Sequence, residues 1–261
     1  MPEGTQVHII AVANQKGGVG KTTTAINLGA ALSEQGNRVL LIDLDPQGNA
    51  STGLGMATDD RQMTTYDLLV EGAGLDEVMA QTSVENLWLC PATTDLSSAD
   101  MQLHGKENRS LLLRQALKHA AAEEFDYILI DCPPSLSLLT VNAMTAAHSV
   151  LVPLQSEFYA LEGLSQLMLT IREIRATANP DLRIEGVVLT MYDGRNNLSQ
   201  QVEADARANL GELVFRTIIP RNVRVSEAPS YALPVLAYDP AASGSLAYRS
   251  LAREMADRHA R

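Results

Sequence analysis

Short apolar runs alternate with segments of helical spacing along almost the whole chain. The runs predict seven strands, and apolar residues recurring every three or four positions predict six helices. Several strands are continuously apolar, as strands covered on both faces are. The alternation predicts an α/β fold with a mostly parallel central sheet flanked by helices on both faces. The expected strands are 7–13, 38–43, 86–90, 126–131, 149–153, 184–190 and 213–219, and the expected helices are 21–35, 109–122, 137–147, 159–178, 198–210 and 243–259.

A single domain over residues 1–261 accounts for this pattern, since no internal repeat, low-complexity segment or linker interrupts it. The segment from about 51 to 85 is richer in Gly, Thr and Asp and is expected to be a mobile excursion. Right-handed crossovers place the connecting loops of such a fold at the carboxyl ends of the strands, where ligands bind.

Residues 14–23, of sequence NQKGGVGKTT, lie between the first predicted strand and the first predicted helix. Strand, glycine-rich loop and helix form the context that a phosphate-binding loop needs, because backbone N–H groups and the helix N-terminus then surround the anion. Lys21 would reach the β- and γ-phosphates, and the Thr22 hydroxyl would hold Mg²⁺. The predicted ATP-binding residues of the loop are Lys16, Gly17, Gly18, Val19, Gly20, Lys21, Thr22 and Thr23.

The loop departs from the usual G-x-x-x-x-G-K-[ST] pattern, which asks for glycine where this chain has Gln15. It carries a second lysine, Lys16, at its start. A lysine there is poorly placed to reach its own phosphates when Lys21 already does so. Lys16 therefore either reaches the nucleotide of a second subunit or is a solvated surface lysine.

Three carboxylates follow two of the predicted strands. Asp43 and Asp45 end the second strand at positions i and i+2, on one face, and Asp131 ends the fourth. Buried like charges are costly unless a cation compensates them, and a Mg²⁺–nucleotide site supplies one. The alternative for residues 43–48 is a surface turn. An apolar strand ending in Asp is a weak signal alone and a strong one after a phosphate loop, so Asp131 is expected to act on Mg²⁺ through a water.

Four motifs in order resemble the ParA/Soj chromosome- and plasmid-partitioning ATPases of the deviant Walker A (ParA/MinD) family. They are residues 16–23, 43–49 (DLDPQGN), 130–135 (IDCPPS) and 219–230 (IPRNVRVSEAPS). The resemblance covers the chain nearly end to end and implies a deviant P-loop NTPase. It implies that Lys16 crosses a dimer interface, that Asp45 positions or activates the attacking water, and that Asp43 and Asp131 complete the magnesium shell. It places Gly17 at the dimer contact, where any side chain should block closure.

The same resemblance implies the remaining contacts and partners. Pro220 and Asn222 would lie beside the adenine, and Arg195, Arg224 and, as a weaker candidate, Arg249 would contact DNA. For each arginine, a structural ion pair is the alternative. The implied protein is an ATP-dependent homodimer with Mg²⁺ that binds double-stranded DNA without sequence preference. Its slow hydrolysis would be stimulated by a ParB-type centromere-binding partner, in the cytoplasm on the nucleoid.

Charge is unevenly distributed. The net charge is −11, but residues 183–261 hold ten cations, all arginine, against nine acids. An acidic body with an arginine-bearing region is compatible with DNA binding, since phosphate contacts depend on local charge, although scattered, paired arginines fit the counts equally well. Two distant cysteines, Cys90 and Cys132, make a disulfide framework or zinc site unexpected and favour a reducing cytosol. Neither a signal peptide nor a membrane span is expected.

Three other functions are alternatives for this sequence. A MinD-like membrane-associated ATPase shares the loop, but residues 246–255 offer only Leu, Met, Tyr and Ala for an apolar face. A nitrogenase-reductase-like electron carrier would need a cysteine pair placed for a shared cluster, and Cys90 and Cys132 do not look free to serve. A dethiobiotin-synthetase-like ligase shares the fold class but fits the motifs at 43–49 and 219–230 poorly.

Overall fold

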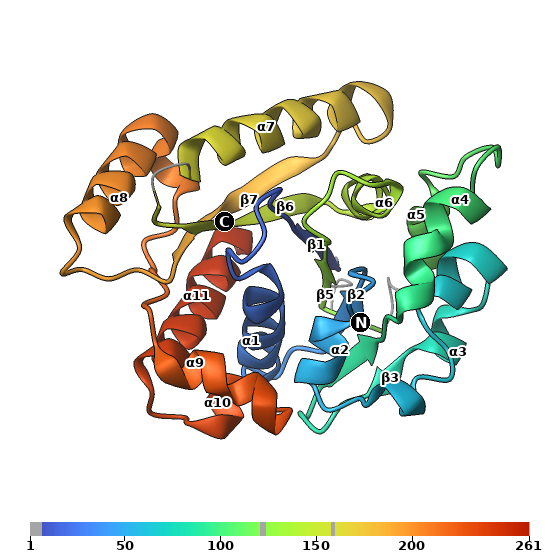
Figure 1. The fold of residues 1–261 in the computed structure, drawn as a ribbon, viewed down its shortest axis with the longest axis horizontal. Helices are drawn as coiled ribbons and strands as arrows, with labels where there is room; N and C mark the ends of the chain where they lie inside the picture. The colour runs from blue at the N-terminus through green and yellow to red at the C-terminus, as the bar shows by residue number, and fades with distance from the viewer. Residues whose placement is uncertain (1–6, 121–123, 158–159, 261) are drawn as a thin grey trace.

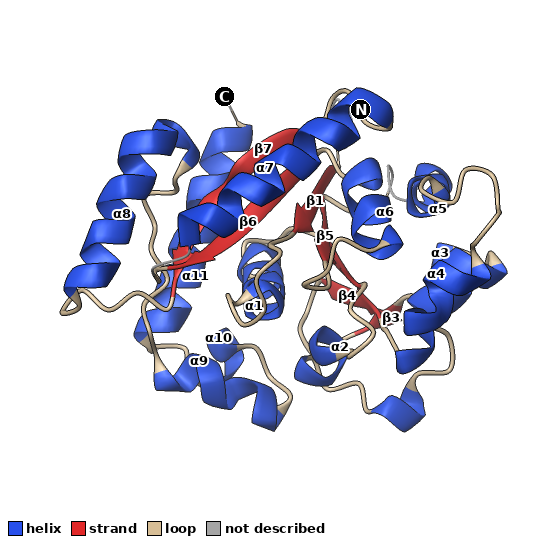
Figure 2. Ribbon diagram, turned by 45° about the horizontal axis from the view of Figure 1, so that its top comes forward, coloured by secondary structure: helices blue, strands red, loops and turns tan. Residues whose placement is uncertain are grey.

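The computed structural model describes residues 7–120, 124–157 and 160–260 of the chain. Its centre is a seven-stranded sheet of order β3-β4-β2-β5-β1-β6-β7, drawn in red in Figure 2. Every neighbouring pair is parallel except β3 and β4, which are antiparallel. The strands are β1 His8–Val12, β2 Val39–Asp43, β3 Ala80–Gln81, β4 Leu87–Cys90, β5 Tyr127–Asp131, β6 Ser149–Gln155 and β7 Arg183–Thr190.

Helices cover both faces of this sheet (Figure 1). Alternate residues of each strand belong to different cores: Leu40 and Ile42 of β2 face one layer, and Leu41 faces the other. The first layer contains α5, α6 and α7, and the second contains α1, α10 and α11. The helices are α1 Lys21–Ser33, α2 Asn49–Gly53, α3 Leu75–Val78, α4 Ala99–Gln102, α5 Leu112–Ala120, α6 Leu138–Ala146, α7 Ala160–Thr177, α8 Asn197–Leu210, α9 Val223–Glu227, α10 Val235–Tyr238 and α11 Ser243–His259.

The predicted fold class is confirmed, and all six predicted helices are found within a few residues of their expected bounds. The start predicted at 159 and the end predicted at 121–122 lie outside the described residues. The continuously apolar strands β2 and β5 are buried along their full length, because helices cover them on both sides.

The strand predicted at 213–219 is wrong. This segment runs beside β7 but joins it only through separate contacts, such as the Phe215 N–H to the Val187 carbonyl at 2.9 Å. The reason is a competing acceptor: the Glu254 carboxylate of α11 accepts the backbone N–H groups of Arg216 and Thr217, at 2.8 and 2.9 Å. These donors are therefore unavailable to a strand ladder.

The segment 51–85, expected to be a mobile excursion, is packed against the sheet instead. It contains the end of α2, the helix α3 and the edge strand β3, with a 3₁₀ turn at Thr58–Asp60 and a π turn at Asp67–Glu71 between them. Its apolar side chains join the main core, buried at Leu68, Leu69, Leu75 and Val78.

A buried polar cluster ties the end of α11 to the amino-terminal edge of the sheet. The His259 ring nitrogen Nε2 lies 2.9 Å from Oε1 of Glu185, and the Ser149 hydroxyl donates to Oε2 of Glu185 at 2.6 Å. The His259 ring also stacks on His8, with centroids 3.9 Å apart. Burial by itself would raise the pKa of Glu185, but hydrogen bonds from His259 and Ser149 and the charge of His259 lower it overall.

We expect His259→Ala to lower the free energy of unfolding at pH 7 by about 1–3 kcal/mol, because a buried carboxylate loses its main partner. His259→Gln, which keeps a donor, should lose less. Because the pKa of Glu185 is depressed in the folded state, its contribution is present above the unfolded value of about 4.3 and is lost as the pH falls through the folded value. Urea titrations at several pH values measure this, and equal stability of wild type and His259→Ala at pH 7 would contradict it.

Candidate nucleotide and metal site

The glycine-rich loop between β1 and α1 has the backbone of an anion cradle. Gly18 and Gly20 adopt left-handed φ angles of 74° and 86°, which residues with a Cβ rarely accept. Gly20 is the N-cap of α1, and no side chain of the described residues caps this helix. The first-turn N–H groups of α1 therefore remain open to a phosphate.

Neighbouring strands hold the loop in place. The Asn14 amide donates to the Pro153 carbonyl of β6 at 2.8 Å, and its Oδ1 accepts the Lys16 N–H at 3.1 Å. The Thr190 hydroxyl at the end of β7 donates to the Val19 carbonyl at 2.8 Å. Asn14 and Thr190 were not singled out from the sequence, although each directly follows or ends an apolar strand, as site residues of this fold do.

Lys21, the first residue of α1, is buried among acceptors. Its Nζ donates to the Lys16 carbonyl at 3.1 Å. Burial lowers the pKa of Lys21, and the charge of Asp131 opposes this shift. The ammonium is thus held at the mouth of the loop, where the phosphate oxygens would replace a carbonyl as its partner.

Asp43 and Asp131 are paired in register at the ends of β2 and β5, and both are fully buried. Asp43 is well supplied with donors: the Ser51 N–H at 2.9 Å, the Ser51 hydroxyl at 2.7 Å and the Asp45 N–H at 3.1 Å. Burial still raises the pKa of Asp43 to about 6.

Asp131 differs from Asp43, because neither of its carboxylate oxygens has a partner of normal hydrogen-bond geometry within the described chain. Burial, and then the charge of Asp43, raise its pKa well above the ordinary value, although the nearby Thr22 hydroxyl lowers it. An orphaned buried carboxylate beside a threonine hydroxyl fits a hydrated cation. Thr22, Asp43 and Asp131 would hold Mg²⁺ there with waters and phosphate oxygens. The described residues contain no cluster of three His, Cys, Asp or Glu that could bind a metal without those additional ligands.

Asp45 lies just outside this pair, at the rim of the site. Its side chain is almost buried, and its Oδ1 accepts the Gln47 N–H at 3.0 Å. This contact closes the turn that follows β2, so the predicted alternative of an exposed surface turn does not describe it. A carboxylate anchored at one oxygen beside the magnesium residues is suited to orienting a water.

An arginine that the sequence did not single out supports this turn. Arg61 is buried and donates to the Ala92 carbonyl at 2.7 Å, the Met56 carbonyl at 2.8 Å and the Thr52 hydroxyl at 2.8 Å. Gly48 passes directly over the guanidinium with φ 62°, and a Cβ there would lie 2.3 Å from a guanidinium nitrogen. Arg61 therefore positions the segment that carries Asp43, Ser51 and Asp45.

The second lysine of the loop is paired with an acid outside the loop. Lys16 Nζ forms an ion pair with Glu157 Oε2 at 2.7 Å, and Glu157 Oε1 accepts the Gln155 amide at 2.6 Å. Gly17 and Gly18 beside it are exposed. A Cβ on Gly17 would meet nothing within 4 Å, so nothing inside one subunit requires glycine at this position.

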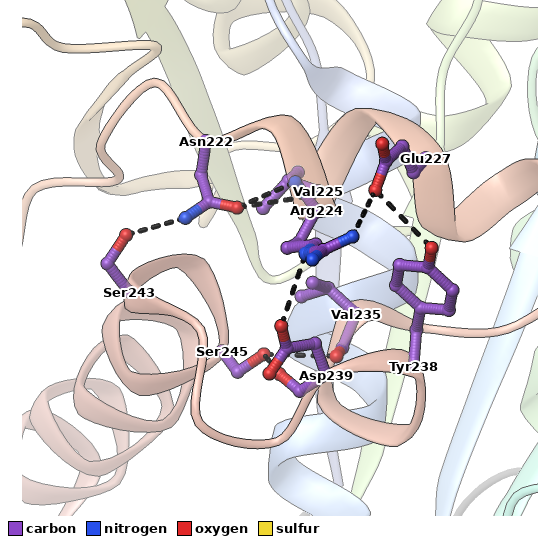
Figure 3. Close-up of polar contacts among 9 residues, drawn as sticks. All are labelled: Asn222, Arg224, Val225, Glu227, Val235, Tyr238, Asp239, Ser243 and Ser245. Atoms are coloured by element: carbon purple, nitrogen blue, oxygen red, sulfur yellow. Dashed lines mark hydrogen bonds and ion pairs between the residues drawn. The ribbon is translucent and has the colours of Figure 1, made fainter.

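One predicted adenine residue, Asn222, and one predicted DNA residue, Arg224, lie together at α9, as Figure 3 shows. Asn222 caps α9: its Oδ1 accepts the N–H groups of Arg224 and Val225, and its Nδ2 donates to the Ser243 hydroxyl at 2.7 Å. Pro220 forms an isolated bridge with Tyr192, just beyond the end of β7. The guanidinium of Arg224 contacts Glu227 at 2.9 Å and Asp239 at 3.4 Å.

The other two predicted DNA contacts, Arg195 and Arg249, differ in how exposed their side chains are. Arg195 pairs with the nearby Asp193 at 2.9 Å, and its side chain is 91% exposed. Arg249 is 24% exposed and makes a two-pronged ion pair with Glu34, at 2.7 and 3.0 Å. It also donates to the Pro240 carbonyl at 2.7 Å, so Arg249 is held more firmly than Arg195. The roles of Arg195, Arg224, Arg249, Pro220 and Asn222 stay predictions.

Known proteins share this architecture. A model of the AAA domain family matches residues 7–184. Chromosome partitioning protein ParA of Caulobacter vibrioides is 56% identical, covering 97% of this chain and 95% of its own length. This chain belongs to the ParA/Soj family of chromosome-partitioning ATPases. Sporulation initiation inhibitor protein Soj of Bacillus subtilis is 52% identical, covering 95% of this chain and 98% of its own length.

A solved structure supports the nucleotide assignment of the ParA/Soj chain. Cobyrinic acid a,c-diamide synthase of Mycobacterium smegmatis, with bound ATP analogue and magnesium, matches with a TM-score of 0.82 and 40% identity, over 95% of this chain and 93% of that chain. The predictions of ATPase activity and of ATP and Mg²⁺ as cofactors are confirmed at the level of the family. That structure is named as a diamide synthase, whereas the relatives above are named as ParA and Soj. Because proteins of one fold act on different substrates, the synthase activity is not carried over to this chain.

No helix in the described part of this ParA/Soj chain has the length and apolar character to cross a bilayer.

We expect Lys21→Ala to abolish measurable ATP binding, a loss of about a hundredfold or more, because a buried, charge-assisted phosphate contact is removed. Isothermal titration with Mg·ATP measures the affinity. Lys106→Ala is the matched control, because Lys106 is exposed and its ammonium donates to the Val70 carbonyl, away from the phosphate loop. Lys21→Ala binding ATP as tightly as the control variant would contradict the assignment.

Proposed function

We propose that this chain is an ATP-dependent dimerising switch of DNA segregation. In this proposal the ATP-bound dimer binds duplex DNA without sequence preference, and hydrolysis, slow by itself and stimulated by a ParB-type partner, releases it. The observation that carries the proposal is the full-length similarity to proteins named for chromosome partitioning. The proposed location is the cytoplasm, on the nucleoid.

The loop supports a dimer in which Lys16 acts on the partner's nucleotide. Its ammonium is paired with Glu157, and its carbonyl accepts the Lys21 ammonium, so Lys21 and not Lys16 is the lysine anchored within the loop. Gly17 is exposed, and a Cβ added to it would meet nothing of the described chain within 4 Å, which leaves room for a second chain to approach. A cation supplied in trans in phosphoryl transfer is worth ~10³–10⁵ in rate, which would make hydrolysis depend on dimerisation.

The three arginines proposed to contact DNA differ in the exposed fraction of their side chains. Arg195 is 91% exposed and Arg224 is 53% exposed, so each can exchange a carboxylate for a phosphate at little cost. Arg249 is the weakest candidate because Glu34 already holds it. Dimerisation would double the number of phosphate contacts and so couple nucleotide state to DNA affinity.

The MinD-like alternative, association with a membrane through the last helix, has little support. Tyr248, Leu251 and Met255 of α11 are buried in the same core as α1. Of the apolar side chains on this helix, Leu246 is an exposed exception. An amphipathic anchor needs a free apolar face, and this helix uses its apolar face inside the subunit.

We expect Asp45→Ala to bind DNA with ATP but not with ADP or without nucleotide, because it traps the ATP state. In that background Arg224→Ala and Arg195→Ala should each weaken binding. The salt slope should fall by ~0.9 per lost phosphate contact, or ~1.8 for a dimer. Fluorescence anisotropy with a random-sequence duplex at several salt concentrations measures both quantities.

Arg172→Ala serves as the matched control, because Arg172 is an exposed arginine on α7 with no ion pair in the described chain. Should the Arg195 and Arg224 variants both keep the affinity and salt slope of this control, the assigned DNA surface is wrong. Absence of DNA binding in every nucleotide state would contradict the proposed function itself.

A further inference from the structure

A cavity of about 870 Å³ lies at the edge of the sheet opposite to the phosphate loop. It surrounds the amino-terminal ends of β1, β6 and β7, whereas the loop follows the carboxyl end of β1. Its size is within the range of small-molecule sites, about 300–1,000 Å³. The residues that carry the argument are His8, Arg114, Lys118, His148, Arg183 and His259.

Among the described residues that line this cavity, basic side chains outnumber acidic ones. Lys118 and Arg183 have no acidic partner within the described chain, and Arg114 donates only to the Ala178 carbonyl, at 3.3 Å. Of the two lining acids, Glu185 has both oxygens occupied by Ser149 and His259, which leaves Asp181 as the lining acid without a hydrogen bond or ion pair among the described residues. The fourth basic residue of the lining, Arg258, is paired with Glu254.

His148 lies beside these cations in the sheet. Its ring accepts the Ile9 N–H through Nδ1 at 3.2 Å and forms a second hydrogen bond with the Val7 backbone. The backbone carbonyl of His148 accepts the Arg183 N–H at 3.0 Å, so the two residues are neighbours along the main chain. The exposed imidazole adds a polar edge to the cavity, and Lys118 and Arg183 supply its positive charge.

Part of the remaining wall consists of flat rings and apolar side chains, next to polar residues such as Thr145 and Asn179. The stacked rings of His8 and His259 form one side, and the side chains of Ile9, Leu117 and Ile184 form another. A site with cations on one side and flat, apolar surfaces on the other suits a ligand that has an anionic group and a planar apolar part.

We propose that this cavity binds a small organic anion, one that joins a carboxylate, sulfonate or phosphate group to a planar apolar part. The anionic group contacts Lys118 and Arg183, and the planar part lies against His8 and His259. The site is separate from the nucleotide site and from the proposed DNA contacts. It touches the end of α11, which packs along α1, the helix that follows the phosphate loop (Figure 1).

The probe for this site is anilinonaphthalene sulfonate, a planar apolar anion whose fluorescence rises when it is buried. Titration of the full chain saturated with Mg·ADP should show saturable binding of one probe per chain. Lys118→Gln/Arg183→Gln should bind the probe about tenfold or more weakly, because two charge-assisted contacts are lost. Inorganic pyrophosphate should displace the probe from wild type at low salt.

Arg172→Gln is the matched control, and it should bind the probe as wild type does. DNA binding of the double variant should also be unchanged, which separates this site from the proposed function. The proposal is overturned if the double variant binds the probe with wild-type affinity or if binding does not saturate. It is equally overturned if Mg·ATP, added to nucleotide-free protein, displaces the probe.

Discussion

Two carboxylates buried side by side are the constraint on which the rest of the site depends. Asp43 and Asp131 end adjacent parallel strands, in register and fully shielded from solvent. Like charges in such surroundings raise each other's pKa and destabilise the folded chain unless cations approach. Lys21 supplies one positive charge. Burial lowers the pKa of the Arg61 guanidinium, and Arg61 is close enough to Asp43 for the charge of Asp43 to oppose this shift. Mg²⁺ with its nucleotide would supply the rest, so ligand binding and stability are linked here.

The surrounding elements keep these charges in place. Ser51 donates twice to Asp43, and its hydroxyl also accepts the Ala92 N–H at 3.0 Å, which joins α2 to the segment after β4. Arg61 clamps the same segments from beneath Gly48. In the phosphate loop, by contrast, both lysines are held by acceptors that a nucleotide and a second subunit would replace. The residues around the metal site are fixed by hydrogen bonds, whereas the two lysines can change partners. This combination fits a hydrolysis reaction that is controlled by dimerisation.

The features that could be predicted from the sequence are those set by short stretches of neighbouring residues. Six of the seven expected strands, and the loop, Asp43 and Asp131 among the site features, follow from apolar runs and the residues that end them. The strand expected at 213–219 failed because its donors are taken by Glu254, nearly forty positions away. Two other contacts could not be predicted for the same reason. The Arg61–Ala92 hydrogen bond and the Arg249–Glu34 ion pair join residues far apart in the chain, and the residues next to them in the sequence do not indicate either contact.

The most direct test of the account is whether Lys16 acts on the partner's nucleotide. Mixing Lys16→Ala with Asp45→Ala gives mixed dimers in which one site has its own Asp45 and receives the partner's Lys16. Random pairing should then restore about a quarter of wild-type ATPase activity from two inactive proteins, since about half the dimers are mixed and each has one complete site. If Lys16 served its own nucleotide, every site in the mixture would lack one residue and no activity would return, which would contradict the central claim.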